Sequence, residues 1–189
     1  MTARKPLLDL LVSMLTARDV LVSCLGANAR YLPHMTVPCP VFALCDSMSA
    51  AIPLGLGMAL QRPDRHVVAL EGDGSLLMSP NVLATVAAAA PSNLTMLLWV
   101  NGRYESSGGQ ALPAVAVDWA ALARAAGIRH VAAVGDVAGL REAFARAGGG
   151  GAGADRGRGR VRSGRGDPAL LRASRRDPRA LPPLAPPRG

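Results

Sequence analysis

Aromatic residues, cysteines and unbroken apolar runs are scarce in this chain of 189 residues, of which only 3% are aromatic. The three cysteines, Cys24, Cys39 and Cys45, are odd in number and form no CxxC pair. That usage argues against a disulfide framework and against a zinc or iron–sulfur site. We therefore expect no metal held by thiolates, and a reducing, cytoplasmic location.

Apolar runs long enough to cross a membrane are also lacking. The most apolar stretch, residues 82–100, is cut by Pro91-Ser92-Asn93 into pieces shorter than the roughly 20 residues that a spanning helix needs. Asp9 interrupts the apolar N-terminal run, and no small-residue cleavage site follows it, so a signal peptide is not predicted. We expect a soluble protein without a membrane segment.

Acidic residues are too few to balance the basic ones, and the formal net charge of the whole chain is +8, but this charge is not spread evenly. Residues 1–147 hold 11 Lys/Arg against 10 Asp/Glu, whereas residues 148–189 hold 10 Arg against 3 Asp. The excess of positive charge therefore belongs to the last 42 residues. Nucleic-acid binding, which a basic chain would otherwise suggest, becomes a question about that tail alone.

Residues 1–147 alternate between apolar strand patterns and helix patterns. The strands read as continuous apolar runs, which is typical of parallel sheets covered on both faces. We predict an α/β domain with helices on both faces of a parallel sheet. The predicted strands are 20–24, 41–45, 66–71, 93–100 and 128–134, and the predicted helices are 6–18, 47–61, 79–90 (capped by Ser79), 118–127 and 136–147.

Two polar segments follow neighbouring strands of this predicted sheet. Asp73 lies in a Gly-Asp-Gly-Ser turn after strand 66–71, and Asn101 follows strand 93–100. Because ligands of open α/β sheets bind beyond the carboxyl ends of the strands, both side chains are expected at the same edge. A carboxylate and an amide oxygen suit Mg²⁺, and the glycines let backbone N–H groups approach phosphates. The pair predicts a magnesium–diphosphate site.

The spacing of Asp73 and Asn101 resembles the cofactor motif of the thiamine diphosphate-dependent enzymes. The surrounding sequence is similar to the cofactor-binding half of the phosphonopyruvate and sulfopyruvate decarboxylases. The similar segments are residues 46–79, 101–110 and 118–128. The similarity extends over about residues 1–146. It implies a thiamine diphosphate-binding fold for residues 1–147.

The resemblance also implies which residues bind the cofactor. Asp73 and Asn101 would ligate Mg²⁺ together with the carbonyl of Arg103, and backbone groups of the 72–75 turn would hold the diphosphate. Residues 46–49 stand where the family has a Gly-Ser-hydrophobic-Gly segment that grips the aminopyrimidine; both flanking glycines are replaced here. The expected cofactor-binding residues are Asp46, Ser47, Met48, Gly72, Asp73, Gly74, Ser75, Asn101, Arg103 and Tyr104.

No catalytic residue is assigned on this chain. Enzymes of the family take an activating glutamate from a separate pyrimidine-binding domain, and only one domain is predicted here. The resemblance therefore implies a hetero-oligomer with a partner subunit, inactive without it, that converts a small 2-oxo acid into an aldehyde and CO₂. A phosphonate or sulfonate substrate would need cations, for which Arg30, His34 and Arg103 lie in suitable loops.

Other functions stay open at this stage. A carboligase fragment related to acetolactate synthase and an inactive remnant of a decarboxylase are both compatible with the motif. A 2-oxo acid:ferredoxin oxidoreductase subunit would bring cysteine clusters, which are lacking. The arginine–glycine tract 156–167 suggests RNA binding, but no aromatic residue is interleaved for stacking, and nucleic acid is not the favoured partner.

The tail 148–189 differs in kind from residues 1–147. Ala, Gly, Arg and Pro fill 32 of its 42 positions, and it has no aromatic residue with which to build a core. The resemblance implies one further apolar strand after helix 136–147. This chain has the Ala-, Gly-, Arg- and Pro-rich tail at that place instead. Two explanations remain open: a disordered tail, or a shift of reading frame near residue 147 in a G/C-rich gene.

Overall fold

The computed structural model describes residues 4–113, 117–147 and 169–172. Its helices are α1 (Arg4–Met14), α2 (Ala27–Tyr31), α3 (Ala51–Gln61), α4 (Asp73–Met78), α5 (Val82–Ala89), α6 (Trp119–Ala125) and α7 (Val137–Arg146), with short 3-10 turns η1 (Leu32–His34) and η2 (Glu105–Ser107). Its strands are β1 (Asp19–Ser23), β2 (Val41–Ala43), β3 (His66–Gly72), β4 (Leu94–Trp99), β5 (Arg103–Tyr104), β6 (Gln110–Ala111), β7 (His130–Ala133) and β8 (Ala169–Arg172).

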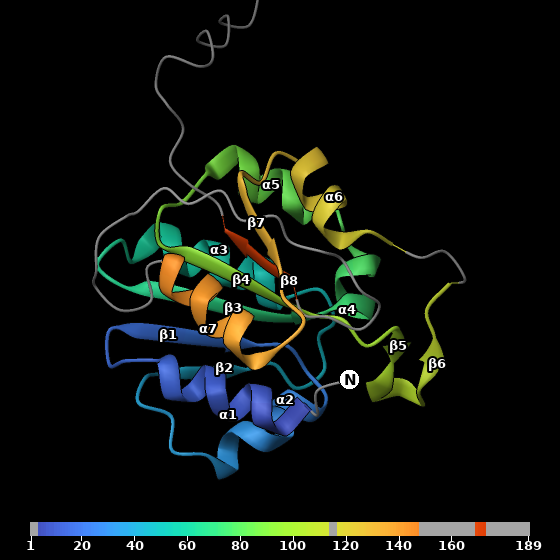
Figure 1. Cartoon of the computed structure of the whole chain (residues 1–189), viewed down its shortest axis with the longest axis horizontal. Coiled ribbons are helices and arrows are strands. Elements are labelled where there is room, and N and C mark those ends of the chain that lie inside the picture. The colour runs from blue at the N-terminus through green and yellow to red at the C-terminus, as the bar shows by residue number, and fades with distance from the viewer. Residues whose placement is uncertain (1–3, 114–116, 148–168, 173–189) are drawn as a thin grey trace, which may run out of the picture.

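One six-stranded sheet organises the chain, in the order β2-β1-β3-β4-β8-β7. Strands β2, β1, β3 and β4 are mutually parallel, with Leu21 opposite Val68 and Ala69 opposite Met96 in the register. These parallel strands bring their carboxyl ends to one edge, from which α4 and the β5–β6 hairpin extend (Figure 1). The predicted parallel α/β sheet is confirmed.

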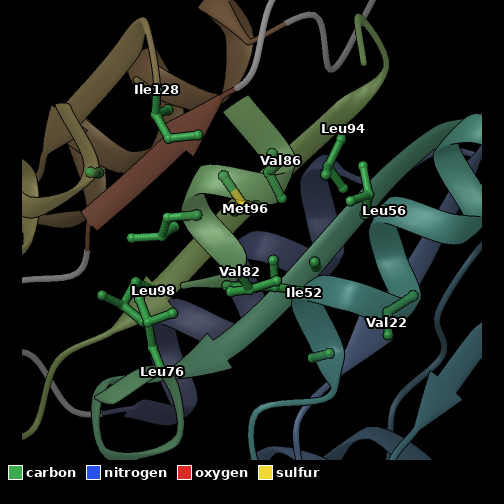
Figure 2. Packing of buried hydrophobic residues seen from close by; sticks show 14 of the residues in the cluster. Val22, Ile52, Leu56, Leu76, Val82, Val86, Leu94, Met96, Leu98 and Ile128 are labelled. Atoms are coloured by element: carbon green, nitrogen blue, oxygen red, sulfur yellow. The ribbon is translucent and has the colours of Figure 1, made fainter. Parts of the chain in front are cut away.

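Helices cover both faces of the sheet, as the continuous apolar strands predict. Helices α3, α5 and α6 pack on one face, and α1 and α7 lie together on the other (Figure 1). Alternate residues of β4 serve the two cores, since Met96 faces the first and Leu97 the second. Figure 2 shows the first core, in which Ile52 and Leu56 of α3 approach Val82 and Val86 of α5 beside the strands.

Two predicted helix starts are wrong. The helix predicted from residue 47 begins at Ala51, because Ser49 has a φ of 61° and cannot belong to a right-handed helix. The helix predicted from residue 79 begins at Val82, since the Ser79 hydroxyl donates to the Asn81 side chain over 2.8 Å and caps no backbone N–H. Ser79 instead ends α4. This short helix was not predicted, because the glycines in residues 72–75 indicate a turn.

Strand β8 lies within the segment assigned to the tail. It sits between β4 and β7 and is antiparallel to both, pairing Leu170 with Leu97 and with Ala132. A short strand therefore forms where the sequence predicts a tail without regular structure. The rest of 148–189 lies outside the described residues, so its predicted disorder stays a prediction.

Candidate functional site

A pocket opens at the carboxyl edge of the parallel strands. It is formed by the residues after β1, β3 and β4, together with Met48 from the loop before α3. The ends of these strands converge there because the strands are parallel and adjacent. The lining comprises Cys24, Leu25, Gly26, Ala27, Asn28, Met48, Gly72, Asp73, Gly74, Ser75, Trp99, Asn101, Arg103, Tyr104, Glu105 and Ser106.

Asp73 links the ends of β3 and β4. Its Oδ2 accepts the backbone N–H of Asn101 over 3.0 Å and that of Gly102 over 2.6 Å, and its Oδ1 accepts the N–H of Gly74 over 2.8 Å. The residue is 2% exposed. Burial raises the pKa of Asp73, while these three N–H groups work in the opposite direction. The predicted proximity of Asp73 and Asn101 is therefore present in the structure.

The donor set at this edge fits Mg²⁺. A carboxylate offers about four lone-pair positions, of which three accept N–H bonds in Asp73, so one position is left for a cation. The Asn101 Oδ1 accepts the Arg103 N–H over 2.8 Å and has a second lone pair. Within the described ranges no cluster of three His, Cys, Asp or Glu residues could hold a metal, so a cation here needs oxygens from a bound phosphate as well.

The pocket also has features that fit a diphosphate. Among the residues that the structure describes, the Oδ1 atom of Asn28 is buried without a hydrogen-bond partner, and its Nδ2 donates to the Cys24 sulfur at 3.8 Å. An amide with an unused group in such a position can turn a donor toward a ligand, and its two ends are interchangeable by a flip of the amide. Gly74 allows the Tyr104 ring to pack directly on the backbone of this turn, because a Cβ there would stand 2.8 Å from that ring.

The β5–β6 hairpin closes one side of this pocket. Tyr104 lies against Gly74, and Arg103 donates from Nη1 to the Gly109 carbonyl over 3.1 Å. Gly108 and Gly109 have φ values of 124° and 77°, as expected for backbone angles that favour glycine. The hairpin itself was not predicted, since strands of two residues leave no periodicity in a sequence.

The segment 46–49 is only partly in the pocket. Met48 lines it, whereas Asp46 and Ser47 are exposed and lie outside its lining. Ser49 keeps a positive φ, the conformation that a glycine adopts most readily. The substitution of this glycine position therefore leaves the backbone in a glycine-like form.

The three cations expected near the substrate separate in the structure. Arg103 lines the pocket, but Arg30 does not, and His34 lines a different hollow between α1 and the η1 turn. Among the expected cations, Arg103 is thus the one at the candidate site.

Several lining residues were not anticipated. Cys24, Gly26 and Asn28 come from the end of β1, and Trp99 from the end of β4. The position of β1 in the middle of the parallel sheet could have indicated them, because its carboxyl end must reach the same edge as that of β3. Cys24 is buried, as the end of an apolar strand predicts, whereas Cys45, at the end of the apolar run 41–45, is exposed.

A second polar cluster lies at the opposite, amino edge of the sheet. His66 bonds through Nδ1 to Asp19 at 2.7 Å and through Nε2 to Thr95 at 2.9 Å. Thr95 is fully buried and Asp19 is 3% exposed, so a substrate cannot reach this Thr–His–Asp cluster. His66 therefore has a structural role, since it links β3 to Asp19 of β1 and to Thr95 of β4.

None of the helices that the structure describes is long and apolar enough to cross a bilayer.

Comparison with known proteins identifies the family of this domain. Residues 24–154 match the family described as "Thiamine pyrophosphate enzyme, C-terminal TPP binding domain". A phosphonopyruvate decarboxylase from Streptomyces hygroscopicus is 41% identical over 140 residues, which are 74% of this chain and 35% of that protein. The sulfopyruvate decarboxylase subunit beta from Methanothermobacter thermautotrophicus is 39% identical over 114 residues, which are 60% of this chain and 61% of that subunit.

A sulfopyruvate decarboxylase from Methanosarcina acetivorans is 41% identical over 104 residues, 54% of this chain and 27% of that protein. The chain thus spans about a third of the length of the phosphonopyruvate decarboxylase it matches, and about three fifths of the beta subunit. The family match covers more than half of the chain and includes every pocket residue named above. The chain belongs to the thiamine pyrophosphate enzymes, and the part it represents is their C-terminal cofactor-binding domain.

Proposed function

We propose that this chain is the thiamine diphosphate- and Mg²⁺-binding subunit of a 2-oxo acid decarboxylase of the phosphonopyruvate or sulfopyruvate type. The observation that carries the proposal is the convergence of Asp73 and Asn101 on one pocket that Gly74 and Met48 also line. The relatives named as decarboxylases support the reaction class.

Each group of the chain has a role in this proposal. The Asp73 carboxylate, the Asn101 amide oxygen and the Arg103 carbonyl would hold Mg²⁺. Backbone groups of Gly72, Gly74 and Ser75 would hold the diphosphate. The aminopyrimidine would lie over Met48, with backbone bonds from the segment Asp46 to Met48, and Tyr104 would close the pocket from the hairpin. Thiamine diphosphate, when bound, supplies the carbanion and the electron sink for loss of CO₂ from a 2-oxo acid.

The activating carboxylate is proposed to come from a pyrimidine-binding partner subunit. Each glutamate of this chain is engaged within the chain: Glu71 accepts the N–H of Ala51 over 3.1 Å, Glu105 accepts from the Asn101 Nδ2 over 2.9 Å, and Glu142 pairs with Arg146. The relatives named as subunit beta support a second subunit. We therefore propose that the chain alone does not decarboxylate.

An anionic group on the substrate is proposed to meet Arg103. Its side chain is exposed on the hairpin at the pocket, where a phosphonate or sulfonate could reach it. No disulfide joins the three cysteines in the part of the chain that the structure describes, and the cytoplasmic location expected from the cysteine usage stays part of this proposal.

Reconstitution tests the proposal. The full chain is mixed with a candidate pyrimidine-binding subunit, thiamine diphosphate, Mg²⁺ and a panel of 2-oxo acids that includes phosphonopyruvate and sulfopyruvate, and aldehyde and CO₂ are measured. We expect decarboxylation only with both subunits and the cofactor. Cofactor binding without turnover of any 2-oxo acid would instead favour the inactive remnant.

Arg103→Lys tests the role of this side chain, because the variant keeps the backbone carbonyl and the positive charge while removing the planar guanidinium. Pyruvate, which lacks the second anionic group, is the control substrate. If Arg103 binds the anionic group, the KM for the phosphonate or sulfonate substrate rises while pyruvate is turned over at an unchanged rate. An equal effect on both substrates would remove Arg103 from substrate recognition.

A further inference from the structure

Two segments that are far apart in the sequence exchange hydrogen bonds behind the pocket. The N–H of Ser49 donates to the Ser75 Oγ over 2.6 Å, and the Ser49 hydroxyl donates back to the Ser75 carbonyl. The two residues are 26 positions apart. Ser49 ends the loop that carries Met48, and Ser75 lies in the first turn of α4.

Glu71 extends this contact into a network. Its carboxylate is 1% exposed and accepts the N–H of Ala51 over 3.1 Å, at the start of α3. The Ser75 hydroxyl and the N–H of Ile52 also interact with this carboxylate and act to lower its pKa, against the burial that raises it. The Ser75 hydroxyl accepts from Ser49 and interacts with the Glu71 carboxylate, while Glu71 binds the start of α3. These contacts tie the end of β3 to the loop that carries Met48 and to the helix that follows it.

The hydroxyl of Ser49 stabilises the unfavourable backbone conformation of this residue. A non-glycine residue with a φ of 61° is in the left-handed region, which disfavours a side chain. The hydroxyl bond to the Ser75 carbonyl offsets that disadvantage, and alanine at this position would keep the unfavourable φ while losing the bond. Glycine would lose the bond but relax the backbone.

We propose that Ser49, Ser75 and Glu71 form a clasp that sets the separation between the loop assigned to the aminopyrimidine and the turn assigned to the diphosphate. This inference rests on the proposed function, because it assigns the two ends of one cofactor to the two clasped segments. The three side chains are positioning residues: they act through Met48 and through the backbone of residues 72–75, and not on the substrate.

A clasp controls the affinity for the whole cofactor, whereas contacts that only stabilise the fold, called here a brace, control the stability of the protein. Thiamine diphosphate would contact both segments, whereas inorganic pyrophosphate would contact only the 72–75 turn. Loosening a clasp therefore weakens the binding of the whole cofactor and spares pyrophosphate. Loosening a brace changes the stability of the protein without changing the ratio of the two affinities.

The test is calorimetric titration of the full chain with thiamine diphosphate and, separately, with pyrophosphate, both in the presence of Mg²⁺. For Ser49→Ala we expect about tenfold weaker binding of thiamine diphosphate and less than twofold weaker binding of pyrophosphate, the effect of losing about one net hydrogen bond. Ser49→Gly should bind the cofactor more tightly than Ser49→Ala. Ser13→Ala is the matched control, since its hydroxyl donates to the Leu10 carbonyl over 2.7 Å on α1, away from the pocket.

Ser75→Ala provides a second variant should Ser49→Ala not fold, because it removes the hydroxyl and keeps the backbone of the turn. It should show the same selective loss. Equal weakening of both ligands, or of neither, in the folded variants would overturn the clasp while leaving the proposed function in place. If the wild-type chain binds neither ligand, both alone and together with a pyrimidine-binding subunit, the proposed function itself fails, and the clasp with it.

Discussion

The backbone N–H of Asn101 donates to the Oδ2 of Asp73 over 3.0 Å, which joins the ends of two adjacent parallel strands, β3 and β4. The bond fixes the carboxylate relative to the Asn101 side chain before any cation arrives. Preorganisation of this kind lowers the conformational cost of binding. The same carboxylate therefore has two tasks, to hold the 101–102 backbone and to offer its remaining lone pair to a metal.

Asp73→Asn should weaken Mg²⁺-dependent binding of thiamine diphosphate at least tenfold. The substitution removes the negative charge that a hard cation prefers and replaces one of the accepting oxygens by an NH₂ group. Titration of the cofactor at several Mg²⁺ concentrations measures the effect. Asp118→Asn is the control, because Asp118 caps α6 through the Ala121 N–H, outside the pocket, and asparagine also caps helices. Unchanged cofactor affinity in Asp73→Asn would exclude Asp73 as a metal ligand.

Gly74→Ala should destabilise the hairpin against the 72–75 turn. The new Cβ would stand 2.8 Å and 2.9 Å from two ring carbons of Tyr104 and 3.1 Å from Leu112, so the hairpin must move. We expect a loss of about 1–3 kcal/mol in the free energy of unfolding, measured by chemical denaturation. Adding Tyr104→Ala should recover part of that loss.

The matched control for this substitution is Gly57→Ala in α3, where no atom lies within 4 Å of the new Cβ. Alanine there should stabilise the chain by about 0.5–1 kcal/mol through its helix propensity. A stability loss at Gly57 as large as that at Gly74 would contradict the steric explanation.

The Asp19–His66 pair should make stability depend on acid pH. Burial acts to raise the pKa of Asp19, but hydrogen bonds from His66 and Thr16 outweigh it and lower that pKa below its usual 3.8. Because the folded pKa is the lower one, the stabilisation is complete above the unfolded pKa and is lost as pH falls through the folded pKa. Asp19→Asn should therefore reduce the free energy of unfolding by about 1–3 kcal/mol at pH 7.

Denaturation at pH 7 and at about pH 3 should show the difference between wild type and Asp19→Asn shrinking toward acid. Asp64→Asn serves as the surface comparison: Arg62 holds the pKa of Asp64 at about 2, yet this pair is exposed and should matter less at either pH. A difference for Asp19→Asn that grows as the pH falls would reverse the assigned sign.

The DNA after codon 147 should encode an apolar strand in another reading frame. Strands β4 and β7 run in the same direction with one position between them, and β8 occupies it antiparallel to both. A strand reached from β7 through α7 by the usual right-handed crossover would run parallel to its neighbours. Translating the DNA in the other two frames tests this; without such a strand in either frame, residues 148–189 are a genuine tail.

Sequence patterns predicted most of the sheet because they report local requirements. Strands such as β3 and β4 are continuous apolar runs, since both faces of the sheet are buried, and the spacing of Asp73 and Asn101 follows from one crossover between adjacent strands. The start of α3 and the existence of α4 were missed. In each case a backbone angle or a contact with a distant segment decides where the helix begins.

The sequence by itself determined the α/β class, the parallel core and the family, through hydrophobic pattern and a motif of fixed spacing. Only the tertiary structure decided which residues share the pocket. It brought in Asn28 and Trp99, left Arg30 and His34 outside, and joined Ser49 to Ser75. The physical reason is that burial patterns act along the chain, whereas a pocket is made by loops whose approach depends on the packing and direction of several strands at once.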